Sequence, residues 1–347
     1  MNHTQSNDKS LLASKWRYLL LAACFLLILS LPLYITSPYN LGIFILVLYF
    51  AFMASAWNIV CGFLGELSLG HCVFVGFGGY TSTLLLTNLG LSPWIGMIAG
   101  AVVAGLTGVI IGYPCFRLRG PYFTLTTIAF AELLRVYLYS TEVGPFGLPL
   151  KGAMGLLLPM RGESLAAMEF RSKVPFFYVI LAFLVVSLLI TYYIQKTRLG
   201  YFLVAIRSDH DAAASLGINI TKYKLIAMAI SCSLIALGGS FYAQYFRYIG
   251  PERIFGIDLS VEIALIALVG GQGTLFGPVI GAFILVPVSE FLSENFGGNI
   301  PGFSLFIYGV VMMLVVMYLP KGVWSYLSKL AGMLDKLMTR GASAKIT

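Results

Sequence analysis

The sequence is poor in charged residues. Only 10% of its 347 residues are Asp, Glu, Lys or Arg, whereas 59% are hydrophobic, and the mean hydropathy is +0.90. Soluble globular domains carry about 25% charged residues. A soluble chain of this composition would leave large apolar patches in water. The composition therefore excludes an ordinary soluble domain and indicates a membrane protein.

The sequence also has few of the residues and motifs on which enzymes depend. It contains three histidines, five cysteines and no Cys-x-x-Cys pair, so no spacing indicates a zinc site or a set of disulfides. A Gly-x-x-x-x-Gly-Lys-Ser/Thr phosphate-binding loop does not occur, so nothing predicts an ATP site on this chain. We therefore expect no metal, no cofactor and no catalytic residues, and a transport subunit rather than an enzyme.

The apolar residues occur in long runs, as in membrane-spanning helices. About 20 residues of helix cross the roughly 30 Å hydrocarbon core of a bilayer. The eighth and ninth runs are short and meet at a glycine-rich turn at 270–274, which predicts either two tilted spans or a re-entrant pair. The first run lacks a small-x-small cleavage site, which favours a retained span over a signal peptide. The predicted segments are 18–35, 41–61, 68–89, 93–115, 121–139, 174–195, 224–246, 257–269, 277–292 and 303–319.

The positions of the cations predict the topology. If the N-terminus is cytoplasmic, 15 of the 22 Lys and Arg residues fall on the cytoplasmic side and 6 outside, while Arg135 falls within a span. We therefore expect an all-α polytopic membrane protein with about ten transmembrane or re-entrant helices and both termini in the cytoplasm.

This topology makes residues 1–347 a single membrane domain. A cytoplasmic segment at 1–17 precedes the transmembrane region at 18–319, and a basic cytoplasmic tail follows at 320–347. Two connections are long: 140–173 outside and 196–223 in the cytoplasm.

Five glycines, together with Ser68 and His71, lie within residues 65–79. Glycine lowers helix propensity, and lipid does not require it. One interpretation is close packing between helices. The other is a broken or re-entrant helix beside a solute pathway, because polar residues within a membrane are usually functional. On this second interpretation the residues that line the translocation path are Glu66, Ser68, Gly70, His71 and Gly76.

The fifth run contains two opposite charges, Glu132 and Arg135, three residues apart on one helix face. This spacing predicts an ion pair in which the two groups neutralise each other. The alternative is a role in gating or in contacting a zwitterionic solute.

The cytoplasmic connection at 196–223 contains a short helical pattern. Asp209 or Asp211 suits the start of a helix, three alanines follow, and Gly217 suits its end. Small side chains on an exposed helix allow a close contact with a partner, so this pattern predicts a protein partner in the cytoplasm. The predicted contact residues are Arg207, Asp211, Ala212, Ala213 and Gly217.

This loop resembles the coupling loop of ATP-binding cassette (ABC) importer permeases, in which Glu-Ala-Ala precedes a glycine at the same spacing. The sequence has Asp211 in place of that Glu and lacks the usual downstream Ile-x-Leu-Pro. The motifs as a set are similar to branched-chain amino acid permeases of the LivM type, over about residues 40–325. They are Gly65-Glu-Leu-Ser-Leu-Gly-His71, Arg117-Leu-Arg-Gly-Pro-Tyr122, Arg198-Leu-Gly-Tyr201, Gly270-Gly-Gln-Gly-Thr274, Gly277-Pro-Val-Ile-Gly281 and Leu319-Pro-Lys-Gly322.

The resemblance implies an ABC importer permease fold and a set of partners. These are a second homologous permease subunit, two ATPase subunits that bind the coupling loop, and an extracytoplasmic solute-binding protein. It implies import of leucine, isoleucine and valine across the bacterial inner membrane; the alternative within the same family is urea or short amides. A different class, an ion-coupled secondary transporter, would use Glu132 or Glu262 as an ion-binding acid and leaves the alanine-rich helix unexplained.

Overall fold

The computed structural model describes residues 26–35, 37–144, 147–159, 162, 164–165, 167–296, 306, 309–310, 313–314, 317–318 and 322–329. The predictions for the cytoplasmic segment 1–17, for most of the tail 320–347 and for parts of the first and last apolar runs fall outside these residues. The described part of the first run, 26–34, is helical, as predicted.

The described chain is mainly helical, and eight predicted runs coincide with helices. Seven helical stretches in this part are long and apolar enough to cross a membrane. The long helices are α2 (Pro38–Asn58), which continues as the π-helix η1 (Ile59–Leu64), α3 (Cys72–Leu89), α4 (Pro93–Cys115), α5 (Pro121–Ser140), α6 (Val174–Lys196), α9 (Ile220–Phe246), α11 (Ile257–Gly271) and α12 (Gly277–Phe296). The shorter elements are η3 (Gly152–Met154), β1 (Leu156–Leu157), α7 (Arg198–Ser208), α8 (His210–Ser215), β2 (Tyr248–Ile249) and α10 (Pro251–Ile254).

Proline and glycine define several helix ends. α2, α4, α5 and α6 each have proline in the first two positions, where its fixed φ suits a helix and its missing N–H leaves no hydrogen bond unmade. η1 ends at Gly65 with φ of +82°, and α3 ends at Gly90 with φ of +67°, a conformation that glycine adopts without strain.

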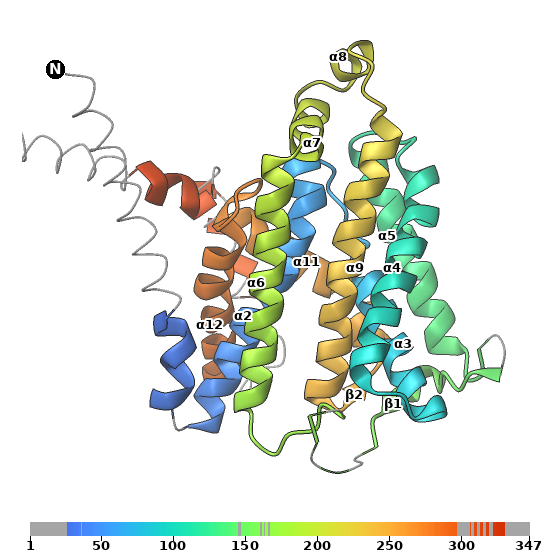
Figure 1. Cartoon of the computed structure of the whole chain (residues 1–347), viewed down its shortest axis with the longest axis vertical. Coiled ribbons are helices and arrows are strands. Elements are labelled where there is room, and N and C mark those ends of the chain that lie inside the picture. Colours follow the sequence, from blue (N-terminus) through green and yellow to red (C-terminus); the bar gives the residue numbers. More distant parts are fainter. Residues whose placement is uncertain are drawn as a thin grey trace, which may run out of the picture.

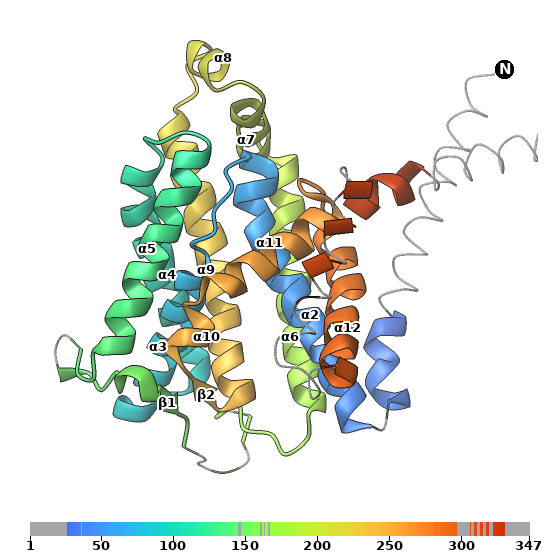
Figure 2. The same cartoon turned by 180° about the vertical axis from the view of Figure 1, so that it is seen from behind.

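Residues 65–71 are not helical and run from the end of η1 into the bundle (Figure 2). This confirms a broken helix, whereas the predicted helix start at residue 68 is wrong. Side chains of other helices replace the intrahelical bonds: Trp57 Nε1 donates to the Ser68 carbonyl at 2.8 Å, and Thr124 Oγ1 donates to the Leu67 carbonyl at 2.7 Å. Irregular backbone persists at membrane depth because protein groups satisfy it.

The core forms around α2. The apolar stretch that it forms with η1 is 83% buried, and α2 packs against α6, α9, α11 and α12. A helix that is apolar on all sides suits a protein core or a membrane, and α2 is in a core. α3, α4 and α9 form a second tight group (Figure 1). Here a Cβ on Gly78 would overlap the Ala236 backbone, and a Cβ on Gly239 would overlap the Val75 carbonyl. Close packing is thus the reason for Gly78.

The two long connections lie at opposite ends of the bundle, as the predicted topology requires. α7 and α8 protrude at one end, and the connection that contains η3 and β1 lies at the other, where β1 pairs with β2 in antiparallel fashion (Figure 1). α7 was not predicted, because the sequence analysis placed only one short helix in this connection.

Candidate coupling and translocation sites

α8 is a single-turn helix with a side-chain cap at its start. The Asp209 carboxylate accepts hydrogen bonds from the backbone N–H groups of Asp211 and Ala212, at 3.0 and 2.9 Å. These N–H groups have no partner within the helix, so the cap satisfies them. The helix is followed by Gly217, whose φ is +80°. The prediction of a glycine stop is confirmed, and Asp209 rather than Asp211 is the cap.

The three alanines of α8 do not share one face. Ala212 and Ala214 are exposed, whereas the exposed fraction of Ala213 is 2%. Consecutive residues of a helix point in directions about 100° apart, so three alanines in a row cannot all face a partner. The expectation that Ala213 lies on an exposed docking face is therefore wrong, and the exposed small side chains are those of its two neighbours.

An exposed ion pair connects α8 to the turn between α4 and α5. Arg119 Nη2 lies 3.1 Å from Asp211 Oδ1, and 80% of the Asp211 side chain is exposed. The hydrogen bond from Arg119, with its positive charge, lowers the pKa of the Asp211 carboxyl. Water screens this pair, so its effect is to orient α8 rather than to stabilise the fold.

Arg207, in the last turn of α7, reaches back to the bundle. Its Nη1 donates a hydrogen bond to the carbonyl of Gly62 in η1. A Cβ on Gly65 would come within 2.7 Å of the Arg207 Cγ, and a Cβ on Gly273 would come within 2.8 Å of its Nη1. A carbonyl at a helix C-terminus lacks an intrahelical donor and favours a cation. One side chain thus contacts both the end of η1 and the turn between α11 and α12.

The Asn58 side chain binds the backbone of the same turn between α11 and α12. Its Oδ1 accepts from the Gly273 N–H at 2.8 Å, and its Nδ2 donates to the Thr274 carbonyl at 2.9 Å. The side chain is buried, so both amide groups are satisfied by backbone rather than by water. The sequence analysis did not single out Asn58, although an amide inside the apolar run 41–61 was a signal.

A buried ion pair joins Glu66 to Lys224 of α9. Lys224 Nζ contacts Glu66 Oε1 and also lies 5.4 Å from the centre of the Phe116 ring. The exposed fractions of the two side chains are 1% for Lys224 and 13% for Glu66. Glu66 also lines a pocket of about 400 Å³, together with Gly65, Leu67, Gly120, Pro121, Thr124 and Leu125. Lys224 is the first residue of the predicted run 224–246, and the structure buries it within α9.

Ser68 and His71 belong to a buried hydrogen-bond network. His71 Nδ1 lies 2.8 Å from Ser68 Oγ, and its Nε2 lies 3.2 Å from Ser231 Oγ. Ser231 Oγ itself donates to the Ala56 carbonyl at 2.8 Å, so the ring must donate to Ser231 through Nε2. A neutral ring then accepts from Ser68. Both predicted pathway residues are fully buried here, with their polar atoms paired.

Gly70 and Gly76 are contact points between helices. A Cβ on Gly70 would come 2.6 Å from the Thr127 carbonyl of α5. A Cβ on Gly76 would overlap the Phe255 ring, which follows α10. The start of α3 also meets the start of α11, where the Cys72 N–H donates to Ser260 Oγ at 2.8 Å. Both glycines therefore allow the broken helix to pack.

α5 is unusual because it buries little of its surface. Only Phe123, Thr127 and Ala131 are buried, a single stripe at every fourth position. Beside this stripe, Arg135 Nε donates to Glu132 Oε2 at 2.9 Å, which confirms the predicted pair. The pair is partly exposed, with 28% of the Arg135 side chain and 49% of the Glu132 side chain accessible.

The described residues contain no group of three or more His, Cys, Asp or Glu side chains placed to hold a metal ion. Cys61, Cys72, Cys115 and Cys232 are buried free thiols. Of the predicted residues, Arg207 lies next to Gly65, Gly76 lies against Phe255, and Gly217 follows α8 at the protruding end.

The helices and the site define a class. A multi-pass helical membrane protein, with a broken helix in its core and a helical pair protruding at one end, has the architecture of a solute permease. The chain belongs to the family described as branched-chain amino acid transport system permease components, which matches residues 39–316. It is a permease subunit of an ABC importer, and in bacteria such a subunit lies in the inner membrane.

Curated relatives share much of the chain. It is 29% identical over 322 residues to the high-affinity branched-chain amino acid transport permease protein LivM of Escherichia coli, covering 88% of this chain and 74% of the relative. It is 30% identical over 283 residues to LivM of Salmonella typhimurium, covering 77% of this chain and 65% of the relative. LivH of Salmonella typhimurium, a permease protein of the same named system, is 23% identical over 292 residues, with 79% and 90% covered. No solved structure matches the chain.

Proposed function

We propose that this permease carries branched-chain amino acids into the cell. The observation that supports the substrate class is the similarity to two LivM proteins over most of the chain. The chain would draw its energy from ATPase subunits, since its sequence offers no phosphate-binding loop.

The proposed assembly has a second permease subunit, two ATPase subunits and an extracytoplasmic solute-binding protein. The similarity of this chain to both LivM and LivH of one bacterium supports a pair of homologous permeases. Such a pair would cover the open face of α5, which the chain by itself leaves exposed.

The end that bears α7 and α8 would face the cytoplasm, and the connection at 141–173 would face outward. The excess of Lys and Arg in segments at the α7–α8 end supports this orientation. We retain the single membrane domain of about ten segments over residues 1–347, with the segment 1–17 and the tail 320–347 both cytoplasmic.

We propose that α8 docks into an ATPase subunit through the exposed face that carries Ala214, whose small side chain permits a close approach. Movement of the docked pair would then reach the bundle through Arg207. Its contacts with Gly62 and Gly273 lie at the end of the central helix and at the turn before α12. A tightly packed junction transmits displacement because its members have no free space.

The open face of α5 would line the translocation path, with Glu132 facing the solute or the second permease and Arg135 next to the buried stripe as its partner. Glu66 and Leu67 border the pocket next to this helix and would lie near the cytoplasmic end of the path. The other predicted residues, namely Ser68, Gly70, His71 and Gly76, would support the wall from behind, since they bind or pack against neighbouring helices.

Uptake by the reconstituted assembly tests the substrate and the energy source together. Proteoliposomes with ATP and the binding protein should take up labelled leucine, and excess valine or isoleucine should compete. Urea and L-arabinose serve as control competitors, the latter because a relative at 24% identity is named an L-arabinose permease. Uptake of urea but not leucine would refute the substrate. Leucine uptake driven by an ion gradient without ATP would refute the ABC mechanism.

Two variants test the coupling route separately. Ala214→Trp should weaken ATPase binding, because a bulky ring separates the two surfaces. Arg207→Gln should leave the ATPase bound but reduce solute-stimulated hydrolysis about tenfold, as expected for loss of a hydrogen bond from a charged group. Ser208→Ala is the control, since Ser208 Oγ bonds only within its own helix, to Val204. Full stimulation in the Arg207→Gln complex would exclude Arg207 from the route.

A further inference from the structure

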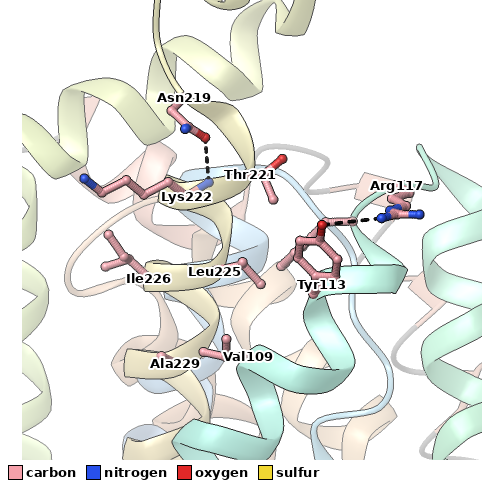
Figure 3. A pocket seen from close by; sticks show the side chains of 10 residues that line it. Val109, Tyr113, Arg117, Asn219, Thr221, Lys222, Leu225, Ile226 and Ala229 are labelled. Atoms are coloured by element: carbon pink, nitrogen blue, oxygen red, sulfur yellow. Dashed lines mark hydrogen bonds between the residues drawn. The ribbon is translucent and has the colours of Figure 1, made fainter.

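An open groove lies between α4 and α9 at the end of the bundle that bears α8 (Figure 3). Its volume is about 770 Å³. The inner part is apolar, and the outer rim carries basic, amide and hydroxyl groups. The apolar wall consists of Val109, Phe116, Leu225, Ile226 and Ala229, and the rim consists of Tyr113, Arg117, Asn219, Thr221 and Lys222.

The outward face of α4 shows at which depth the rim lies. Large apolar side chains are exposed along it at intervals of three or four residues: Ile95, Ile98, Val102, Leu106 and Ile110. Such a stripe favours contact with the acyl chains of the hydrocarbon core. The same face continues with Tyr113 and then Arg117, the residue types that anchor a helix at the lipid headgroups. The rim of the groove therefore lies at the membrane surface, and its apolar part lies among the acyl chains.

Neither cation of the rim, Arg117 or Lys222, is paired with a carboxylate in the described residues. The only described contact of the Arg117 guanidinium is with Tyr113, whose hydroxyl lies 3.4 Å from Nη2 and whose ring centre lies 5.1 Å from Cζ. The backbone N–H of Lys222 donates to Asn219 Oδ1 at 3.1 Å. Its ammonium pairs with no carboxylate in the described part of the chain. Figure 3 shows the two cationic side chains on opposite sides of the groove, Arg117 next to Tyr113 and Lys222 on α9, so the rim as a whole is basic.

The groove begins where the packing of the two helices changes. At Gly108 the helices touch, because a Cβ there would come 2.8 Å from Cys232 Sγ. One residue further on, Val109 already lines the open groove, together with Ala229. The groove thus runs from a closed end inside the bilayer to a basic rim at its surface.

We infer that this groove binds an anionic phospholipid of the cytoplasmic leaflet. Its phosphate would lie at the rim, where the long Arg117 and Lys222 side chains can turn toward it, and an acyl chain would lie along Val109, Leu225 and Ala229. A free phosphate would satisfy only the rim, and a neutral lipid would leave both cations without a partner, whereas an anionic lipid satisfies both halves. This inference depends on the proposed orientation but not on the solute.

Lipid retention tests the inference. The full chain, purified in its complex, is exchanged into phosphatidylcholine containing phosphatidylglycerol, and the retained lipids are counted by native mass spectrometry. Phosphatidylglycerol should be retained preferentially. Each cation removed should reduce its affinity about fivefold, so Arg117→Gln with Lys222→Gln should reduce it roughly thirtyfold. The matched control, Lys196→Gln with Arg198→Gln, removes the same charge from the junction of α6 and α7 and should retain wild-type binding.

A second variant tests the apolar half. Ala229→Phe fills the groove but keeps both cations, so it should also lose phosphatidylglycerol, and inorganic phosphate should not displace the lipid from the wild type. Wild-type retention in the double Gln variant would overturn the inference, as would displacement by phosphate. A crosslink from position 226 to the second permease would equally overturn it, because protein would then cover the groove.

Discussion

The buried pair of Glu66 and Lys224 should respond asymmetrically to mutation. Loss of Glu66 leaves the Lys224 ammonium at 1% exposure, with only the face of Phe116 nearby at 5.4 Å. Loss of Lys224 leaves a carboxylate that borders a pocket of about 400 Å³ and can regain water. The cost of an unpaired charge depends on how well water can reach it.

This difference in access to water sets the loss of stability that we expect for each variant. Glu66→Leu should lower the free energy of unfolding by about 3–5 kcal/mol, the usual result of removing one partner of a buried pair. Lys224→Met should cost less, about 1–3 kcal/mol, because the remaining carboxylate is hydrated from the pocket. The double variant should be close to wild type, since two apolar side chains of similar volume often replace a buried pair without loss.

Equilibrium unfolding in mixed micelles of increasing dodecyl sulfate content measures these values as a double-mutant cycle. Glu132→Gln is the control, because it breaks the more exposed pair with Arg135 on α5 and should change stability little. The reasoning is refuted if Lys224→Met costs as much as Glu66→Leu, or if the double variant is no more stable than Glu66→Leu.

Three further predictions concern the junctions. Asn58→Leu should cost about 2 kcal/mol, because two backbone groups of the 273–274 turn lose their partners, and hydrogen exchange at that turn should rise. Gly239→Ala should prevent stable assembly of α3 with α9 in a thermal-stability assay, whereas Gly112→Ala, whose nearest atom would be 3.2 Å away, should be tolerated. The Asp211 pKa is lowered in the fold, so the contact of α8 with Arg119 exists above that pKa and is lost as pH falls through it. Arg119→Gln should raise the Asp211 pKa, measured from the carboxyl chemical shift of labelled Asp; an unchanged titration midpoint would exclude the pair.

Much of the helical layout could be predicted because it depends on local properties. α4 occupies the predicted residues 93–115, and α6 ends one residue beyond the prediction. The length of such a span is determined by the rise per residue of a helix and by the apolar thickness of the bilayer. The start of α8 was ambiguous between two acids because both suit a cap, and only the backbone of Asp209 has the extended conformation of an N-cap.

The site was less predictable because its contacts join distant segments. Glu66 was singled out, but its partner lies 158 residues away, and Asn58 meets Gly273 across 215 residues. Ala213 was expected on the outside because composition alone does not show which side of a short helix faces the protein.

The sequence by itself determined that the protein lies in a membrane. It also determined most of the spans, the placement of the two long connections at opposite ends, and the family. Hydropathy, charge bias and motif order depend on residues that are close in the sequence, so they can be determined without coordinates. Only the tertiary structure decided that Lys224 is buried and paired, that His71 is bonded on both ring nitrogens, and that Arg207 contacts the central helix. Which charge neutralises which, and which glycine meets which carbonyl, depend on how the helices pack, and packing is settled by the whole chain at once.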